Sequence, residues 1–561
     1  MKNLPLGQVL VEAGFLTQEK LEEALQMQKG SGKRLGDLLV DNGFVTEHNL
    51  MLALQQRLEV PFLDLRDQRI DRNAVQLVPE ELAKKYNLIP LKLSGDELTV
   101  ATNNPLDFYA FEELSLVTGM RVSSVLATKQ DIRDAIQRCY AQQGAQSALE
   151  QLTREYEDLP ETARGEDYSD MLERVESAPV VRLVNSIVAQ AFHMRASDIH
   201  IEPGEESVCV RFRVDGDLIE AMRLNHTIHV SLITRLKILS SIDIGERRLP
   251  QDGHFTADVD GKTVNLRVST LPTVHGEKAV LRIMGDNTLD IVDLRDTGIT
   301  EKNYQRLQSL MLNPNGIILV TGPTGSGKST TIYSMLHQLA TPNVNIVTIE
   351  DPVEKIIPGI SQVQVNPKAG LTFASGLRSI LRQDPDRIMI GEIRDAETAQ
   401  IAARAAITGH LVLTTVHTND AASTFMRLID MGVEPYIVAS SVVGVVSQRL
   451  VKLICPHCKR EETPQEQALA CWEGELPEHF YSGGGCARCN FTGYLGRTAI
   501  HEVVSVSPQV RQLIVRNASS GEIKEAIRRE GGQFLKDDLA RLVYEGRTTL
   551  AELMRVTYNI E

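Results

Sequence analysis

The chain has 561 residues, of which 42% are apolar and 24% are charged, and its formal net charge is −15. This length exceeds what one hydrophobic core serves, so three or more domains are expected, and the composition excludes disordered and fibrous classes. The acidic balance, the single Trp and the 5% aromatic content disfavour a nucleic-acid-binding protein, which needs basic surface and stacking rings.

No apolar run approaches the ~18–20 residues that cross a bilayer. The first residues, MKNLPLGQVL, contain no signal-peptide apolar block followed by a small-residue cleavage site. We therefore expect a cytoplasmic protein whose contact with the membrane is peripheral.

The N-terminal segment contains a tandem repeat across residues 5–57 with a period of 29 residues. LGQVLVEAGFLTQEKLEEALQMQ at 6–28 recurs as LGDLLVDNGFVTEHNLMLALQQR at 35–57. Each copy predicts two short helices, with Thr17 and Thr46 as N-caps of the second helix. A repeat this short needs no ligand, so a purely structural helical module is one interpretation.

The next segments predict a change of architecture. Residues 60–143 predict a small α/β unit with strands at 98–101 and 122–126, which completes an N-terminal module over residues 1–143. The polar, non-periodic residues 144–177 predict a linker.

Residues 178–288 predict a second, mixed α/β domain. Val180, Leu183, Val184, Ile187 and Ala191 keep helical spacing on one face. Four apolar runs predict strands, and Asp260-Gly261 between two of them predicts a hairpin turn. These strands are expected at 208–214, 255–259, 264–268 and 279–283.

From residue 289 to residue 561, apolar strands alternate with helical segments. This alternation predicts a parallel sheet with crossover helices. A helix is expected at 328–340, directly after the first strand. The strands are expected at 316–321, 345–349, 387–391 and 411–416.

The segment after the first of these strands fits GxxxxGK[ST] and opens a helix, which is the context of a phosphate-binding P-loop. Its glycines let consecutive N–H groups point at phosphates, the lysine reaches the β- and γ-phosphates, and the serine holds Mg²⁺. The nucleotide-binding residues predicted here are Gly322, Pro323, Thr324, Gly325, Ser326, Gly327, Lys328 and Ser329, with Thr330 following in the first helical turn.

Carboxylates follow two of the predicted strands, where the strand ends of a parallel sheet face the nucleotide. Glu392 is placed to act on Mg²⁺ through water, and either Glu350 or Glu354 is placed to activate the attacking water. His417 follows a third strand and is placed to contact the γ-phosphate.

Four strings resemble the secretion-superfamily ATPases, and among them the type IV pilus assembly and type II secretion ATPases known as PilB and GspE. They are TGPTGSGKSTT, IEDPVE, LRSILRQDPDRIMIGEIRD and ITGHLVLTTVHTND, in this order. The resemblance covers the chain from residue 178 to the end. It implies a hexameric ring in which each subunit has a PAS-like domain at 178–288 and a RecA-like domain at 289–561, with the active site between them.

The resemblance also implies residue roles. Glu354 resembles the catalytic glutamate, and Glu392 resembles the Walker B residue, with Gly391 where most P-loop proteins have Asp. Arginines are implied to neutralise the γ-phosphate, and the matching positions are Arg267, Arg282, Arg378 and Arg382. Without the family, Arg267 and Arg282 on alternating strands are better interpreted as solvated surface residues.

Two CxxC pairs lie within residues 450–498. Cys455, Cys458, Cys486 and Cys489 can supply four thiolates to a structural Zn²⁺, which leaves no open position for catalysis. Between the pairs, six glutamates outnumber Lys459 and Arg460, so a protein partner is more plausible there than a nucleic acid. The resemblance implies that this element faces the inner-membrane platform protein.

The N-terminal repeat resembles the cyclic-di-GMP-binding module of some of these ATPases, which opens Arg-Leu-Gly and closes Leu-xxx-Leu-xx-Gln. The second copy opens with Arg34 but closes with Arg57, and the first closes with Gln28 but opens with Pro5. Each copy departs from the motif at one polar position. Binding of cyclic-di-GMP and a structural domain that docks on a membrane-associated adaptor both stay open.

The leading interpretation is an ATPase that converts ATP and water to ADP and phosphate. It would drive pilin polymerisation into a type IV pilus, or type II protein secretion, at the inner membrane. Alternatives are a DNA-uptake motor on the same fold and a cyclic-di-GMP-responsive nucleotide sensor. Direct contact with nucleic acid is not expected.

Overall fold

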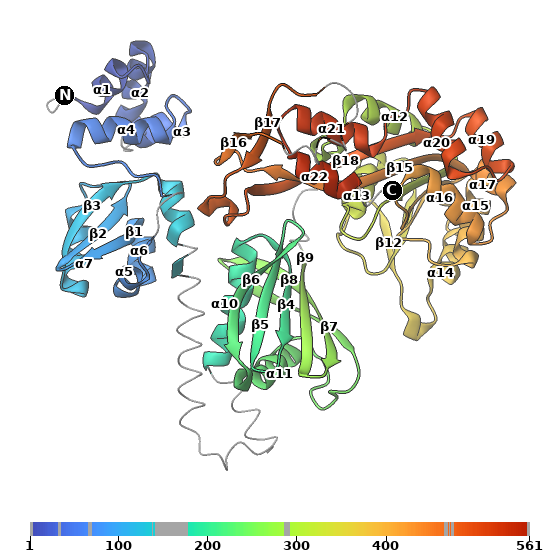
Figure 1. Cartoon of the computed structure of the whole chain (residues 1–561), viewed down its shortest axis with the longest axis horizontal. Helices are drawn as coiled ribbons and strands as arrows, with labels where there is room; N and C mark the ends of the chain where they lie inside the picture. The colour runs from blue at the N-terminus through green and yellow to red at the C-terminus, as the bar shows by residue number, and fades with distance from the viewer. Residues whose placement is uncertain are drawn as a thin grey trace. The chain divides into compact units, whose positions relative to one another are not determined.

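The computed structural model describes residues 4–31, 35–65, 70–136, 139–140, 178–284, 292–464, 469, 472 and 476–557. The chain divides into two compact units, Met1–Ile283 and Met284–Glu561 (Figure 1). The predicted linker at 144–177 and Arg34 lie outside the described residues. Within those residues, no helix has the length and apolar character that crossing a membrane requires.

The tandem repeat forms two pairs of helices, as predicted, and several of its recurring residues pack between the helices of each pair. A Cβ atom on Gly7 would lie 2.4 Å from the Leu21 side chain, and one on Gly36 would lie 3.2 Å from that of Leu50. The glycines therefore let the first helix of each pair approach the second. Thr46 caps its helix as predicted, accepting the Asn49 N–H at 3.3 Å. The four helices are α1 Leu6–Glu12, α2 Gln18–Ser31, α3 Leu35–Asp41 and α4 Glu47–Leu58.

A three-stranded sheet with three helices follows the repeat. Strand β2 pairs antiparallel with β1 and parallel with β3. The two predicted strands correspond to β2 and β3, whereas β1, which contains Pro90, was not predicted. The elements are α5 Arg72–Leu77, α6 Glu80–Tyr86, β1 Leu88–Ser94, β2 Glu97–Thr102, α7 Phe108–Thr118 and β3 Arg121–Leu126.

The rest of the first unit is a six-stranded sheet in the order β6-β5-β4-β9-β8-β7. Helices α10 and α11 pack on one face of it (Figure 1). The predicted Asp260-Gly261 hairpin joins β7 to β8, with positive φ angles of 54° and 75°. Two strands, β4 and β6, were not predicted. The elements are α10 Ala178–His193, β4 Ala196–Pro203, β5 Ser207–Val214, β6 Asp217–Asn225, α11 His229–Leu239, β7 Gln251–Val259, β8 Lys262–Thr273 and β9 Gly276–Met284.

The second unit is built on a seven-stranded sheet in the order β12-β11-β13-β14-β10-β15-β18. The first six strands are parallel, as the alternation predicted, and β18 pairs antiparallel with β15 at the edge. The carboxyl ends of the parallel strands therefore share one edge. The strands are β10 Gly316–Thr321, β11 Ile346–Glu350, β12 Ser361–Gln364, β13 Arg387–Ile390, β14 Leu411–Val416, β15 Val442–Ile454 and β18 Tyr494–Ser505.

Helices cover both faces of this sheet. One face packs on α12 Glu301–Met311 and α13 Lys328–Leu339. The opposite face packs on α14 Phe373–Ile380, α15 Ala396–Ile407, α16 Ala421–Asp430, α17 Pro435–Ser441, α19 Pro508–Val515 and α20 Ser520–Arg529.

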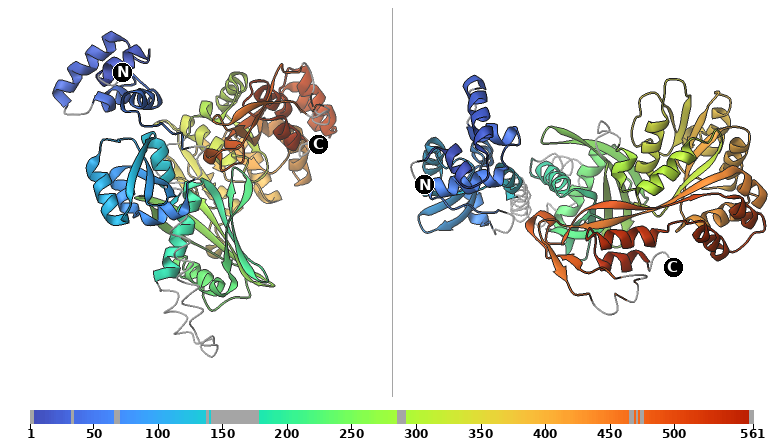
Figure 2. Two further views of the ribbon diagram at one scale, coloured as in Figure 1. Left: turned by 60° about the vertical axis from the view of Figure 1, so that its left-hand side comes forward. Right: turned by 90° about the horizontal axis from the view of Figure 1, so that it is seen from above.

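Strands β15 and β18 extend beyond the sheet to the cysteine loops (Figure 2). Along this extension they pack on α21 Leu535–Tyr544 and α22 Leu550–Thr557. A short ribbon of β16 Lys459–Glu462 and β17 Phe480–Gly483 lies between the CxxC pairs.

Candidate active site and metal centre

The predicted P-loop joins β10, which is buried at all six positions, to α13. Gly322 has a φ of 149°, and a Cβ atom there would lie 2.5 Å from both Gln448 O and Ser326 Oγ. Gly325 and Gly327 have φ angles of 76° and 88°, in the region that favours glycine. The glycine spacing is therefore required by the loop conformation itself, and this conformation leaves the start of α13 as an anion-binding end.

Lys328 is buried at the start of α13, with 9% of its surface exposed. Its Nζ donates to Gly322 O at 2.8 Å and to Pro323 O at 3.0 Å. Burial lowers the pKa of Lys328 to about 8, against the opposing charge of Glu392. The ammonium thus lies in a desolvated position, where its charge acts strongly on a phosphate.

The two carboxylates of the IEDPVE string have different environments. Glu350 is 4% exposed, and its carboxylate accepts from Tyr333 Oη, Thr348 Oγ1 and Gln362 Nε2. Glu354 is exposed, and among the described residues its carboxylate has no recorded hydrogen bond or ion pair. Its backbone N–H donates to Tyr333 Oη at 3.1 Å.

Glu392 and His417, which follow β13 and β14, meet at the carboxyl edge of the sheet. His417 Nε2 lies 3.4 Å from one Glu392 oxygen, and Arg394 lies 2.5 Å from the other. Arg394 also reaches Asp351 at 3.4 Å. Burial, with help from the Lys328 charge, lowers the pKa of His417, which favours the neutral ring, and the N–H of a neutral imidazole can donate to Glu392.

Two further side chains next to the P-loop were missed by sequence reasoning. Gln448 and Arg449 lie on β15, directly beyond the register pair of Thr321. Gln448 Nε2 donates to Ser326 O at 2.7 Å, and Arg449 Nη2 donates to Asn419 O at 3.2 Å. The sequence pattern that could have identified them is the polar string Ser-Gln-Arg directly after an apolar run. Glu392 was predicted from a pattern of the same kind.

The predicted arginines have other observed neighbours. Arg378 on α14 pairs with Glu397, and Arg382 donates to the carbonyl of Arg378 at 2.9 Å. In the first unit, Arg282 on β9 pairs with Asp198 at 2.9 Å, and Arg267 on β8 lies exposed opposite His254. Arg378 and Arg382 therefore have partners other than the P-loop, whereas Arg267 and Arg282 belong to the first unit and the P-loop lysine to the second.

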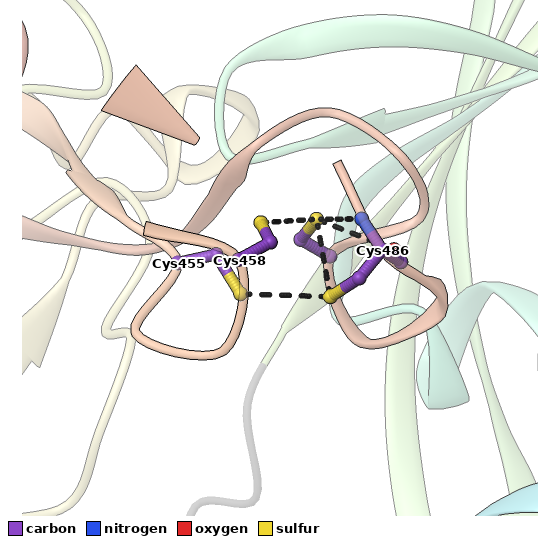
Figure 3. A group of neighbouring side chains, drawn as sticks. Cys455, Cys458 and Cys486 are labelled. Atoms are coloured by element: carbon purple, nitrogen blue, oxygen red, sulfur yellow. Dashed lines mark hydrogen bonds between the residues drawn. The ribbon is translucent and has the colours of Figure 1, made fainter. Parts of the chain in front are cut away.

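The four predicted cysteines converge, with sulfur atoms all within 4.8 Å of one another (Figure 3). Cys455 and Cys486 are 3.8 Å apart, and Cys458 and Cys489 are 3.9 Å apart. Tetrahedral Zn²⁺ with bonds of about 2.3 Å separates its sulfurs by about 3.8 Å. Backbone N–H groups of Cys486 and Gly493 donate to Cys489 Sγ at 3.1 and 3.3 Å, as suits a thiolate. The donor set and spacing fit zinc.

Family models match both halves of the chain. A model described as Type II/IV secretion system protein matches residues 173–555. The MshEN domain model matches residues 58–146, a range that includes the three-stranded sheet β1–β3 and its helices. The second match therefore covers the segment after the helical repeat, whereas the sequence pattern had assigned the resemblance to the repeat.

Relatives that match over nearly their whole length are proteins of type IV pilus assembly and of type II secretion. The chain is 41% identical over 558 residues to the Type IV pilus assembly ATPase PilB of Myxococcus xanthus, and covers 98% of each protein. It is 39% identical over 566 residues to Type II secretion system protein E of Xanthomonas campestris, again over 98% of each. Among solved structures, the Legionella pneumophila ATPase DotB has a TM-score of 0.51 at 23% identity, over 67% of this chain and 95% of DotB. That likeness concerns the fold alone.

Proposed function

The chain belongs to the type II/IV secretion system protein family and is an ATPase, and from this premise we propose that it is the hexameric motor of type IV pilus assembly. It would add pilin subunits at the inner face of the cytoplasmic membrane. The observation that supports this most is 41% identity to a pilus assembly ATPase over 98% of both chains. Type II secretion is the second candidate, supported by 39% identity over 98% of both chains to a secretion ATPase.

In this proposal the P-loop residues bind the triphosphate of ATP. The backbone N–H groups of 324–329 surround the phosphates, and Lys328 exchanges its two carbonyl partners for the β- and γ-phosphates. Mg²⁺, held by Ser329 directly and Glu392 through water, would neutralise charge on these phosphates. His417 keeps Glu392 oriented by donating to its carboxylate.

We assign the role of general base to Glu354 rather than Glu350. Glu350 accepts three side-chain hydrogen bonds and is buried, so its oxygens are committed to the fold. The Glu354 carboxylate is exposed and makes no hydrogen bond or ion pair with any described residue, so it can orient a water and accept its proton. The proton passes to Glu354 as the water oxygen forms its bond to the γ-phosphorus and the ADP oxygen leaves.

Substitution of the base tests this assignment directly. Glu354→Gln should lower kcat for ATP hydrolysis by about 100-fold or more, while the Kd of a fluorescent ATP analogue stays within about twofold. Lys328→Ala should lose binding, and Glu434→Gln, at an exposed glutamate of the same unit, should behave as wild type. Normal turnover in Glu354→Gln would overturn the assignment.

The family resemblance supports the remaining assignments. The six-stranded domain at 178–283 would be PAS-like and the P-loop unit RecA-like. Arg267, Arg282, Arg378 and Arg382 would then complete the site when subunits assemble into a ring. Zn²⁺ would be structural, and the protein would be cytoplasmic, docked on the platform protein and an adaptor.

The choice between machines is testable in the source organism. Deletion of the gene should abolish surface pili while leaving exoprotein secretion intact, and Lys328→Ala should fail to restore them. Loss of secretion with normal pili would favour the second candidate.

The N-terminal module would regulate the ATPase by binding cyclic-di-GMP. This proposal is supported by the match of the MshEN domain model to residues 58–146. Gln28 and Arg57, which close the two copies of the repeat, are the ligand candidates in its described part. Titration calorimetry of cyclic-di-GMP into the full chain, with Arg57→Ala as the comparison, tests this role. If the titration of cyclic-di-GMP produces no binding heat, the regulatory role is rejected and the module is structural.

A further inference from the structure

The hydroxyl of Tyr333 is buried beneath the catalytic edge and makes every hydrogen bond available to it. Tyr333 lies on α13 and is 5% exposed. Its Oη donates to Glu350 Oε2 and accepts the N–H groups of Glu354 at 3.1 Å and Lys355 at 3.4 Å. Burial and the Glu350 carboxylate raise the pKa of Tyr333, so the hydroxyl keeps the one proton that it donates.

The second half of this arrangement comes from β12. Gln362 Nε2 donates to Glu350 Oε1 at 3.1 Å and to Lys355 O at 2.9 Å, while its Oε1 accepts the Ile357 N–H at 2.7 Å. Glu350 thus receives Tyr333 on one oxygen and Gln362 on the other. The backbone of the loop that carries Glu354 is held from two sides, while the Glu354 carboxylate makes no hydrogen bond within the described part of the chain.

We infer that Tyr333 is a positioning residue for hydrolysis, which fastens the backbone of the general base Glu354 to the helix that binds the phosphates. This inference rests on the proposed role of Glu354. Helix α13 begins at Lys328, and Tyr333 lies five residues later on the same helix. Lys328, which holds the γ-phosphate, and Glu354, which activates water, are therefore both anchored to helix α13. A displacement of about 1 Å in such a site is enough to cost on the order of 100-fold in rate.

The first test is Tyr333→Phe, which keeps the buried ring and removes only the hydroxyl. Without it, two backbone N–H groups lose their acceptor and Glu350 loses a donor. We expect kcat for ATP hydrolysis to fall by about 10- to 100-fold. The P-loop contacts are untouched, so the Kd of the fluorescent ATP analogue should stay within about twofold of wild type.

The chain offers a matched control. Tyr304 on α12 belongs to the same hydrophobic core as Tyr333, is 6% exposed, and its hydroxyl accepts from Gln308 Nε2 at 2.7 Å. Tyr304→Phe therefore removes a buried hydroxyl from the same core with no bond to the Glu354 loop. It should lower Tm without lowering kcat by more than about twofold. Equal kcat values in the two variants would overturn the inference.

A double variant separates this inference from the role of Glu354. If Tyr333 acts through Glu354, Tyr333→Phe should cause no further loss of the residual rate in a Glu354→Gln background. Normal turnover in Glu354→Gln alone would reject the assigned base, whereas an additive loss in the double variant would reject the positioning role only. If Tyr333→Phe does not fold, Gln362→Ala loosens the same loop from β12. A kcat loss at unchanged Kd then supports the inference, and an unchanged kcat overturns it.

Discussion

Buried charged side chains around the P-loop differ in whether the fold already satisfies them. Glu350 is fully bonded, whereas Arg449 Nη1 and Glu502 Oε1 are buried without a recorded partner in the described chain. Among the described residues, Lys328 donates to two carbonyls of its own loop and to no other group. The ammonium of Lys328 and the guanidinium of Arg449 can therefore gain hydrogen bonds when a phosphate binds. The carboxylate of Glu350 already has its hydrogen bonds and gains none.

The depressed pKa of Lys328 predicts a pH dependence of nucleotide affinity. With a pKa of about 8, the free enzyme is about nine-tenths protonated at this lysine at pH 7 and about one-tenth at pH 9. Phosphate favours the ammonium, so affinity for an ATP analogue should weaken by about tenfold between pH 7 and pH 9. Fluorescence titration at both values measures this. A Kd that does not change over this range would show that Lys328 stays fully charged.

Glu502 predicts a different pH effect, on stability. It lies on β18, and burial raises its pKa from 4.5 to about 8, with a smaller effect of Asp420. A raised folded-state pKa stabilises the fold fully below about pH 4.5 and loses that effect as the pH rises through about 8. The Tm advantage of Glu502→Gln over wild type should therefore grow from pH 5 to pH 8.5. A Tm difference independent of pH would contradict the buried, protonated carboxyl.

At the residue scale, sequence reasoning found the groups that follow strands in recognisable strings. The P-loop, Glu354, Glu392 and His417 all lie at the carboxyl edge where the alternation placed them. Tyr333 could not be found in this way, because a tyrosine on an apolar helix face has the pattern of any core residue. Its partners are Glu350 and a loop 21 residues away, and only the fold brings them together.

At the scale of elements, strands with continuous apolar runs were predicted almost to the residue, as β10 and β14 show. Strands β4 and β6 were missed because their outer faces carry charge. On β4, Asp198, His200 and Glu202 alternate with apolar residues, and their pairing with basic residues on β5 and β9 is a property of the sheet. Charged strands of this kind look like loops until their neighbours are known.

The cysteine element predicts a separable metal effect. The four thiols close the far ends of β15 and β18, so one zinc per chain should be found by elemental analysis and lost in Cys486→Ser. That variant should have a lower Tm, yet bind an ATP analogue normally, since the P-loop contacts Gln448 near the middle of β15 and the cysteines lie beyond its carboxyl end. Cys209→Ser, at a free cysteine of β5, should keep its zinc. Full zinc content in Cys486→Ser would contradict the site.

At the scale of the whole molecule, the proposed site takes its lysine, its base and its Walker B carboxylate from the P-loop unit, whereas two of the arginines proposed to meet the phosphate, Arg267 and Arg282, belong to the other unit. Charge that builds on the transferred phosphoryl group is usually met by an arginine, which a neighbouring subunit can supply. The site of one chain is therefore incomplete in this account, and hydrolysis depends on assembly of the ring. This property belongs to the oligomer, so no pattern within one sequence can establish it.

The most direct measurement is the rate of ATP hydrolysis per subunit as protein concentration rises, with Lys328→Ala as the blank and with the size of each sample determined in parallel. The account predicts a rate per subunit that climbs and saturates as the hexamer forms, and no turnover in Lys328→Ala. Full turnover by a sample that remains monomeric would contradict it.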